Sequence, residues 1–283
     1  MKNLLLLFIT ATLAFVVQIE SRAQEFAIFE DLVILPFDVT KWDALDSTIL
    51  IVNYKQTLTD PERSGGPRSE EYTLQIGRKY SKYYSSNTNI MDEVESGLRD
   101  KGNRMVWYDG ASLYCNLLEH KLTVVEREYF SKWEESGAYK YEEEVPQFEW
   151  EMTSDTLTIL GHSCFKAKTS FRGRDWYVWF APEVPMPIYP WKFNGLPGAI
   201  LGFEDSKGVF SSRAIEISAS KEPIKWFKWH YSETTREELN DYQRKVHDRP
   251  SLILLDGEPL YQISADGMGI ANDPIPYQPM ELE

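Results

Sequence analysis

The stretch YPWKFNGLPGAILGFED, residues 189–205, decides how the middle of the chain folds. It places a proline and a glycine, Pro197 and Gly198, between an aromatic segment and an apolar run. Proline fixes φ at the second position of a type II turn, and glycine accepts the positive φ of the third position. We therefore predict a turn that directs the chain into a buried strand over residues 199–203. The residues of this turn are Gly195, Leu196, Pro197 and Gly198.

The segment that precedes this turn is rich in aromatic residues and contains four prolines, at positions 182, 185, 187 and 190. A proline removes a backbone donor, so a central strand cannot continue much beyond Phe180. We expect an ordered loop held by aromatic packing. This loop either covers the core or presents a surface to a ligand or partner. Its candidate binding residues are Tyr189, Trp191, Phe193 and Asn194.

Period-two alternation of apolar and polar residues dominates the rest of the chain and is typical of β-strands. The predicted strands are 47–54, 72–76, 121–130, 138–145, 148–152, 157–164, 166–170, 175–180, 209–217 and 224–229. Turns are predicted at 153–156 and 172–174, and Gly161 is predicted to mark a bulge. Helices are predicted over 89–98 and 235–247, the second opened by a capping box from Thr234 to Glu237.

These elements predict a mainly β (α+β) fold. Short turns join consecutive strands, and short turns permit only antiparallel neighbours. We expect one large curved antiparallel sheet, half-barrel-like, with a few peripheral helices and the loop of prolines and aromatic residues. Residues 24–283 are predicted to form a single domain, with a loose tail over 273–283.

The N-terminal residues 1–23 have the composition of a secretory signal peptide. A basic start is followed by an apolar run from Leu4 to Val17, and Ser21-Arg22-Ala23 supplies a cleavage site after Ala23. The apolar run is too short to cross a bilayer, and no later stretch approaches that length. No cysteine follows the run, so a lipid-anchored N-terminus is not expected. We predict a periplasmic or secreted protein.

The charge of the chain limits its partners. The 283 residues carry a formal net charge of −14. Nucleic acids and anionic lipid headgroups bind to cation-rich surfaces, so neither is an expected partner. No motif for a cofactor or a metal is present, and we predict none.

The run from Leu157 to Asp205 resembles the GLPGLI family of secreted proteins from Bacteroidetes. The segments FRGRDW and PWKFNGLPG carry much of this resemblance. The matching positions are Cys164, Lys166, Ala167, Arg172, Gly173, Arg174, Trp176, Trp179, Glu183, Pro185, Trp191 and Gly195 to Gly198. Two positions depart from the family pattern, because Ala199-Ile200 replaces Leu-Ile and His162 replaces a tyrosine. The resemblance implies export but no established biochemical activity.

Several residues are candidates for chemical sites. Cys115 and Cys164 either form a disulfide or remain two separate thiols. His162 and Cys164 share one strand face but lack further metal ligands nearby, which disfavours a metal site. No nucleophile with a general base is evident, so no catalytic residues are predicted.

Charged residues near the aromatic loop allow two further interpretations. Arg172 and Arg174 either form an anion pocket or pair with acidic partners among Glu183, Glu204 and Asp205; the ion pairs are favoured in so acidic a chain. A carboxylate pair of Glu183 and Asp205 would suit an acid/base hydrolase only if a fixed separation held them.

The sequence favours a non-catalytic binding or accessory protein. The expected partner is a protein of the cell envelope, and an outer-membrane transporter component is the suggested kind. The alternatives are a carrier of an apolar ligand in a half-barrel cavity and an acid/base hydrolase. The candidate binding residues include Arg172, Arg174 and Glu183 together with the aromatic loop.

Overall fold

The structure is a computed structural model, which describes residues 37–60, 66–99, 111–127, 137–249, 254–255, 258–259, 274 and 277–283. The predicted signal peptide lies outside these residues. Among the helices of the described part, none is long and apolar enough to cross a membrane.

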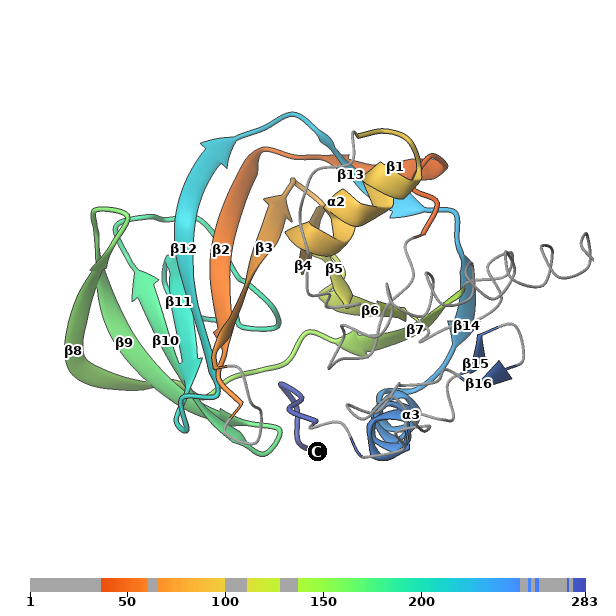
Figure 1. Ribbon diagram of the computed structural model, residues 1–283. Helices are drawn as coiled ribbons and strands as arrows, with labels where there is room; N and C mark the ends of the chain where they lie inside the picture. Colours follow the sequence, from red (N-terminus) through yellow and green to blue (C-terminus); the bar gives the residue numbers. More distant parts are fainter. Residues whose placement is uncertain are drawn as a thin grey trace, which may run out of the picture.

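A twelve-stranded sheet forms the body of the molecule, which confirms the mainly β prediction. All neighbouring strands are antiparallel except β14 and β7, which are parallel. The sheet bends round as Figure 1 shows. Its strands, from one edge to the other, are β14 (His230–Glu233), β7 (Gly137–Glu144), β6 (Lys121–Arg127), β5 (Ser112–Asn116), β4 (Tyr80–Ser85), β3 (Arg68–Ile76), β2 (Leu50–Leu58), β12 (Phe210–Ala219), β11 (Ala199–Asp205), β10 (Arg174–Ala181), β9 (His162–Phe171) and β8 (Glu151–Ile159).

Smaller elements flank this sheet (Figure 1). They are the pair β1 (Trp42–Ser47) and β13 (Pro223–Phe227), the pair β15 (Leu254–Leu255) and β16 (Glu258–Pro259), and the helices α2 (Ser86–Glu95) and α3 (Arg236–Asp248). α2 starts three residues earlier than predicted because the Ser85 side chain caps it by accepting a hydrogen bond from the Thr88 amide. In α3 the capping box joins Thr235 and Glu238, one residue beyond the predicted pair.

The β8–β9 connection differs from the prediction. The chain reverses at Leu160 and Gly161, which have φ values of 52° and 82°. Two positive φ values fit the two-residue type I′ hairpin turn. This turn sets the register, so residues 153–156 stay inside β8 as a bulge between Met152 and Thr156. The predicted turn at 153–156 and the predicted bulge at Gly161 are therefore both wrong.

The β9–β10 hairpin turns where the sequence predicted. Arg172 and Gly173 have φ values of 45° and 79° and form a second two-residue connection. Bulges also shift the register between β10 and β11 and between β12 and β2. Because bulges bend strands and increase their twist, they contribute to the curvature of the sheet.

The Pro197-Gly198 bend returns the chain as predicted and starts β11. Gly198 has a φ of 106°, and a Cβ atom there would lie 2.2 Å from the Ala181 carbonyl oxygen. Only glycine fits this close approach of two backbones. The Leu196 carbonyl accepts a hydrogen bond from the Tyr189 hydroxyl at 3.2 Å, which ties the aromatic loop to the bend.

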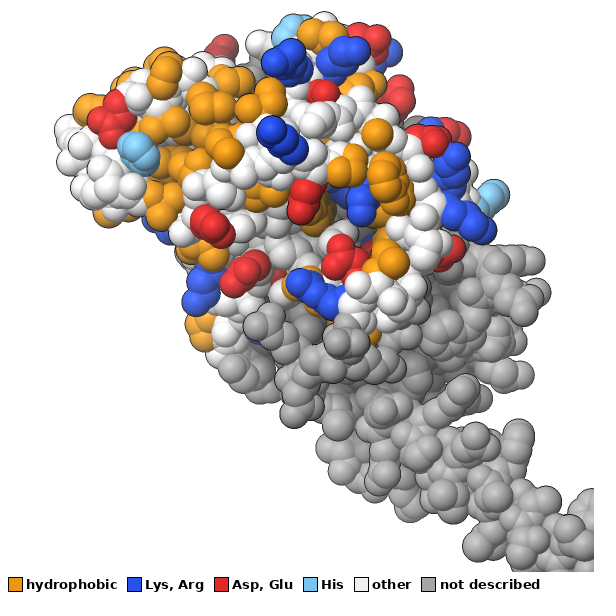
Figure 2. Space-filling view, turned by 90° about the horizontal axis from the view of Figure 1, so that it is seen from above, with side chains coloured by type: hydrophobic (Ala, Val, Ile, Leu, Met, Phe, Trp, Pro, Cys, Tyr) orange, Lys and Arg blue, Asp and Glu red, His pale blue; other side chains and the backbone are white. Residues whose placement is uncertain are grey.

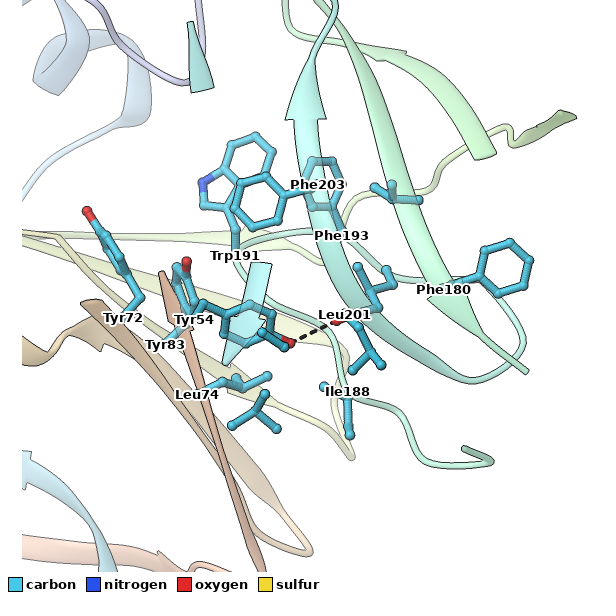
Figure 3. Close-up of a cluster of buried hydrophobic side chains, with 14 of the residues drawn as sticks. Tyr54, Tyr72, Leu74, Tyr83, Phe180, Ile188, Trp191, Phe193, Leu201 and Phe203 are labelled. Atoms are coloured by element: carbon cyan, nitrogen blue, oxygen red, sulfur yellow. Dashed lines mark hydrogen bonds between the residues drawn. The ribbon is translucent and has the colours of Figure 1, made fainter. Parts of the chain in front are cut away.

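The aromatic loop lies inside the curve of the sheet and forms part of the core. Figure 3 shows Trp191 and Phe193 between the tyrosines of β2 to β4 and the strands β10 and β11. The Trp191 and Phe193 rings meet edge to face with centroids 4.9 Å apart, and Phe193 packs on the fully buried Trp176 at 5.4 Å. These aromatic contacts hold the loop against β10.

The two cysteines are free thiols. Cys115 lies in β5 and Cys164 in β9, and six strands separate these two in the sheet order. Neighbouring strands are about 4.8 Å apart, far too much in total for a disulfide. Of the alternatives left open by the sequence, the structure therefore has the two separate thiols.

Candidate functional site

The hairpin formed by β8 and β9 carries a concentration of exposed apolar side chains. Ten large hydrophobic side chains are exposed among the described residues, and four of them belong to this hairpin. We call these four the apolar edge: Met152, Leu157, Leu160 and Phe165. Figure 2 shows hydrophobic side chains gathered on this side of the molecule.

The apolar edge wraps round both faces of the hairpin. Register places Met152 opposite Ala167 and Thr156 opposite Phe165, so Met152 and Phe165 share one face. Leu157 is opposite Cys164 and points to the other face. β8 is the last strand of the sheet order, so its outer side pairs with no strand of the described part of the chain. A surface patch of this kind marks an interaction site or an aggregation risk.

Three exposed acidic side chains lie on β8 and the loop after β10, each within 4 Å of a basic side chain of β9. The side chains of Glu151, Asp155 and Glu183 are exposed by 75%, 59% and 52%. Glu183 fixes the start of the proline-containing loop to β9, because its carboxylate lies 2.9 Å from His162 Nδ1 and accepts a hydrogen bond from the Ser163 amide. The exposed prolines at 182, 185 and 187 therefore adjoin the apolar edge.

The opposite end of the β9–β10 hairpin is charged. Arg174 pairs with Asp205 at 3.1 Å, and their side chains are only 4% and 1% exposed. The Arg174 guanidinium also donates two hydrogen bonds to the Pro279 carbonyl. Of the two alternatives for Arg174, the structure has the ion pair with an acidic partner. An open hollow of about 450 Å³ lies beside the pair, lined among others by Asp175, Lys207 and Glu283.

A second ion-pair cluster lies at the same end. Arg172 pairs with Glu143 at 2.5 Å and also with Glu281. The almost fully buried Lys192 pairs with the same two carboxylates, 2.6 Å from Glu143. Burial raises the pKa of Glu143, but Lys192 and Arg172 lower it more, so the pKa falls below its ordinary value. We call the residues Glu143, Arg172, Arg174, Lys192, Asp205 and Glu281 the charged end.

The charged end contradicts part of the sequence interpretation. Arg172 pairs with Glu143 and Glu281, which are not among the acidic partners that the sequence suggested, whereas Arg174 pairs with the suggested Asp205. The predicted loose tail also fails over residues 277–283, because Glu281 and Pro279 are bound in this cluster. Lys192, Glu143 and Glu281 were missed. No local pattern could find them, since three distant segments meet here.

The aromatic candidates do not form a surface. Trp191 and Phe193 are 8% and 1% exposed and belong to the core. The Asn194 side chain donates hydrogen bonds to the Pro146 and Lys192 carbonyls, which holds the loop rather than a ligand. Tyr189 is half-buried and bonded to the bend. Of the two alternatives for the loop, its aromatic residues cover the core, and a partner surface formed by Trp191 and Phe193 is wrong.

The carboxylates of the hydrolase alternative are far apart. Glu183 lies two residues beyond Ala181, the last residue of β10, whereas Asp205 pairs with Trp176 near the beginning of that strand. The extended strand from Trp176 to Ala181 alone spans roughly 17 Å, and Glu183 lies in the turn beyond it. A carboxylate pair that hydrolyses glycosides needs a separation of about 5–10 Å. Glu183 and Asp205 therefore cannot act as such a pair.

Neither thiol is activated. Burial raises the pKa of Cys115 to about 11 and raises the pKa of Cys164 as well. Thiols with raised pKa values are weak nucleophiles and weak metal ligands at neutral pH. The residues that the structure describes contain no cluster of three or more His, Cys, Asp or Glu that could hold a metal ion.

The fold places this chain in the class of mainly β proteins with one large open sheet. No protein-family model matches the chain, and no curated protein matches it in sequence. Among solved structures it is similar to PNGF-II in two crystal forms, at 13% identity, with TM-scores of 0.46 and 0.47 over 69% and 71% of this chain. It spans about a third of the PNGF-II chain, at 32% and 33%.

A third solved structure is the LolA superfamily protein NE2245 from Nitrosomonas europaea. That match has 11% identity and a TM-score of 0.28, and covers 71% of this chain and 94% of NE2245. Likenesses this distant assign this chain neither a family nor an activity.

Proposed function

We propose that this chain is an exported accessory protein that binds a protein partner of the cell envelope through its apolar edge. The predicted signal peptide and the resemblance to the GLPGLI family support export to the periplasm or beyond. The observation that carries the binding role is the exposure of Met152 and Phe165, by 53% and 42%, on the last hairpin of the sheet. Burying such side chains on a partner stabilises a complex by removing apolar area from water.

The surroundings of the apolar edge indicate the chemistry of the partner. Glu151, Asp155 and Glu183 remain more than half exposed beside the patch, although each lies near a basic side chain of β9. We expect the partner to combine an apolar centre with a lysine- or arginine-rich rim that shares these carboxylates. The bulge in β8 interrupts the edge backbone, so side chains rather than a long added strand would carry the contact. An outer-membrane transporter component is the kind of partner we favour.

The carrier alternative has less support. A half-barrel carrier needs an open apolar space inside the curve of the sheet. Here Trp191, Phe193 and Ile188 of the chain itself pack into that space and are buried (Figure 3). A bound apolar ligand would have to displace this aromatic loop, together with the hydrogen bond from Tyr189 that holds it.

Site-specific photocrosslinking in the native envelope tests the proposal. A photoreactive residue is placed at position 152 or 165, and at Leu118 as a control, because Leu118 is 66% exposed but lies between β5 and β6. We expect one envelope protein to be captured from positions 152 and 165 and not from 118. The captured protein is then purified, and its affinity is measured. Phe165→Glu should weaken binding at least tenfold, and Leu118→Glu should leave it unchanged.

Two results would overturn the proposal. One is capture of the same proteins from all three positions, which would indicate random encounters. The other is an affinity for the purified partner that does not change with Phe165→Glu or Met152→Glu in a chain with an unchanged melting temperature.

A further inference from the structure

Residues 277–283 lie against the charged end of the sheet, and we call them the docked segment. Figure 1 shows the end of the traced chain beside the β9–β10 hairpin and α3. The Leu282 amide donates a hydrogen bond of 2.9 Å to the Arg172 carbonyl, as an added strand would. The Met280 side chain packs against the main core cluster. The segment therefore fills a groove formed by elements that are distant in the sequence.

One carboxylate of the docked segment lies among three cations. Glu281 pairs with Arg172 and Lys192, and Arg236 of α3 lies 3.7 Å from the same carboxylate. The Lys192 side chain is 2% exposed and that of Glu281 is 11% exposed. Without Glu281, the carboxylate of Glu143 would be the remaining acidic partner of Arg172 and Lys192 in this cluster. A buried cation that loses its partner is costly, so the groove favours a carboxylate at this position.

Most of the other contacts of the docked segment are made to its extended backbone. Arg174 binds the Pro279 carbonyl with two N–H groups, at 3.0 and 2.7 Å. Asn240 donates to the backbone oxygen of Glu283, and the Tyr277 hydroxyl donates to Gln243. Gly173 leaves room for the segment, since a Cβ atom there would be 2.9 Å from Leu282 Cβ. Backbone contacts with one carboxylate and one apolar pocket are typical of peptide recognition.

We propose that the groove at the charged end is a binding site for extended acidic peptides, and that residues 277–283 are its displaceable internal ligand. Peptides of this class have an apolar residue followed by a glutamate, as in Met280-Glu281. The residue after the glutamate has a backbone N–H that can donate to the Arg172 carbonyl, as that of Leu282 does. The internal segment competes at a high effective concentration because it belongs to the same chain. Weakening it should therefore expose the groove to an added peptide.

The test uses the full chain and a fluorescent synthetic peptide with the sequence of residues 277–283, YQPMELE. Fluorescence anisotropy measures its affinity for the wild type and for the Glu281→Gln and Glu283→Gln variants. Glu283→Gln is the matched control, because the Glu283 side chain makes no ion pair among the described residues. We expect Glu281→Gln to raise the affinity at least tenfold over the wild type and Glu283→Gln to leave it unchanged. A peptide with glutamine in place of its first glutamate should bind the Glu281→Gln chain at least tenfold more weakly.

The proposal is overturned if the folded Glu281→Gln chain fails to bind the peptide, or binds it no better than the wild type. If the Glu281→Gln variant does not fold, hydrogen exchange of the wild type tests whether the docked segment can leave the groove. We expect the Leu282 amide to exchange through local opening, faster than the amides of β10. Exchange of both only through global unfolding would show that the segment is a fixed part of the fold. A concentration-dependent dimer that exchanges the segment between copies would overturn its assignment as an internal ligand.

Discussion

The apolar edge and the charged end belong to adjoining hairpins of one sheet, yet their side chains differ in burial: those of the charged end are covered by other segments, and those of the apolar edge are exposed. At the charged end, distant segments supply carboxylates to Arg172, Arg174 and Lys192, and these side chains lose most of their contact with water. At the apolar edge, Met152 and Phe165 remain in contact with water although burial would favour them. The comparison indicates that the charged groups of the charged end are already paired within the chain, whereas the side chains of the apolar edge are not covered by any described part of it.

The largest expected effect is at the charged end. Arg174→Met should lower the free energy of unfolding by about 3–5 kcal/mol, because it leaves the buried Asp205 carboxylate without its cation. Urea unfolding at neutral pH measures this change. Adding Asp205→Asn should recover much of the loss.

The matched control for this prediction is Arg213→Met. The Arg213 side chain is 33% exposed and pairs with Glu204 on the outer face of the sheet. A half-exposed pair contributes about 1 kcal/mol or less. If both arginine variants unfold at the same urea concentration, the buried ion pair of Arg174 contributes no more to stability than the partly exposed pair of Arg213, and the prediction is wrong.

The next effect tests whether the backbone beside the apolar edge is rigid. Gly198→Val should cost roughly 2–4 kcal/mol, because the position has a positive φ and the side chain would strike the Ala181 carbonyl. Gly208→Val is the control, since Gly208 also has a positive φ but nothing lies within 4 Å of its Cβ position. Thermal unfolding of both variants measures the difference. Equal melting temperatures would contradict the close approach at Gly198.

Acid should weaken the charged end selectively. The pKa of Glu143 is lower in the folded protein than its ordinary value of 4.5, so the unfolded chain takes up the proton first as the pH falls. The stabilisation is therefore complete above about pH 4.5 and is lost as the pH falls through the folded pKa.

Urea unfolding of the wild type and Glu143→Gln, measured from pH 6 to pH 3, tests whether this stabilisation is lost as the pH falls. We expect the stability difference between them to shrink by about 1 kcal/mol over that range. Glu144→Gln, in the exposed neighbouring residue, should follow the wild type. A constant difference between wild type and Glu143→Gln would contradict the role of the carboxylate.

The smallest effect is expected at the apolar edge. Phe165→Ala should change the free energy of unfolding by less than about 1 kcal/mol, because the ring is 42% exposed. Phe180→Ala removes the neighbouring ring, which is 2% exposed, and should cost about 3–5 kcal/mol. Both values come from chemical denaturation at neutral pH. A similar cost for the two variants would make Phe165 a core residue and would remove the basis for the proposed binding role.

Local sequence patterns predicted the elements whose geometry depends on neighbouring residues. The positive φ of Gly198, the hairpin turn at Gly173 and the strand β3 follow from turn chemistry and alternation. The same reasoning failed at residues 153–156, whose polar side chains suit a turn and an exposed bulge equally well. The register of the β8–β9 pair decided between them.

The sequence could not predict the residues of the charged end as a group. Glu143, Lys192 and Glu281 are far apart in the chain, and each resembles an ordinary surface charge until the strands assemble. The position of the aromatic loop could not be predicted from the sequence either. Its composition is compatible with a core and with a binding surface, and only packing inside the curved sheet makes Phe193 a core residue.

The sequence by itself determined the mainly β architecture and the bend at Pro197 and Gly198, because backbone dihedrals and alternation are set by adjacent residues. Tertiary structure alone decided that Trp191 is buried, that Cys115 and Cys164 stay apart and that Phe165 faces water. These outcomes depend on the order of twelve strands and the curvature of their sheet. Contacts between residues more than a hundred positions apart are a property of the assembled sheet, so no local pattern records them.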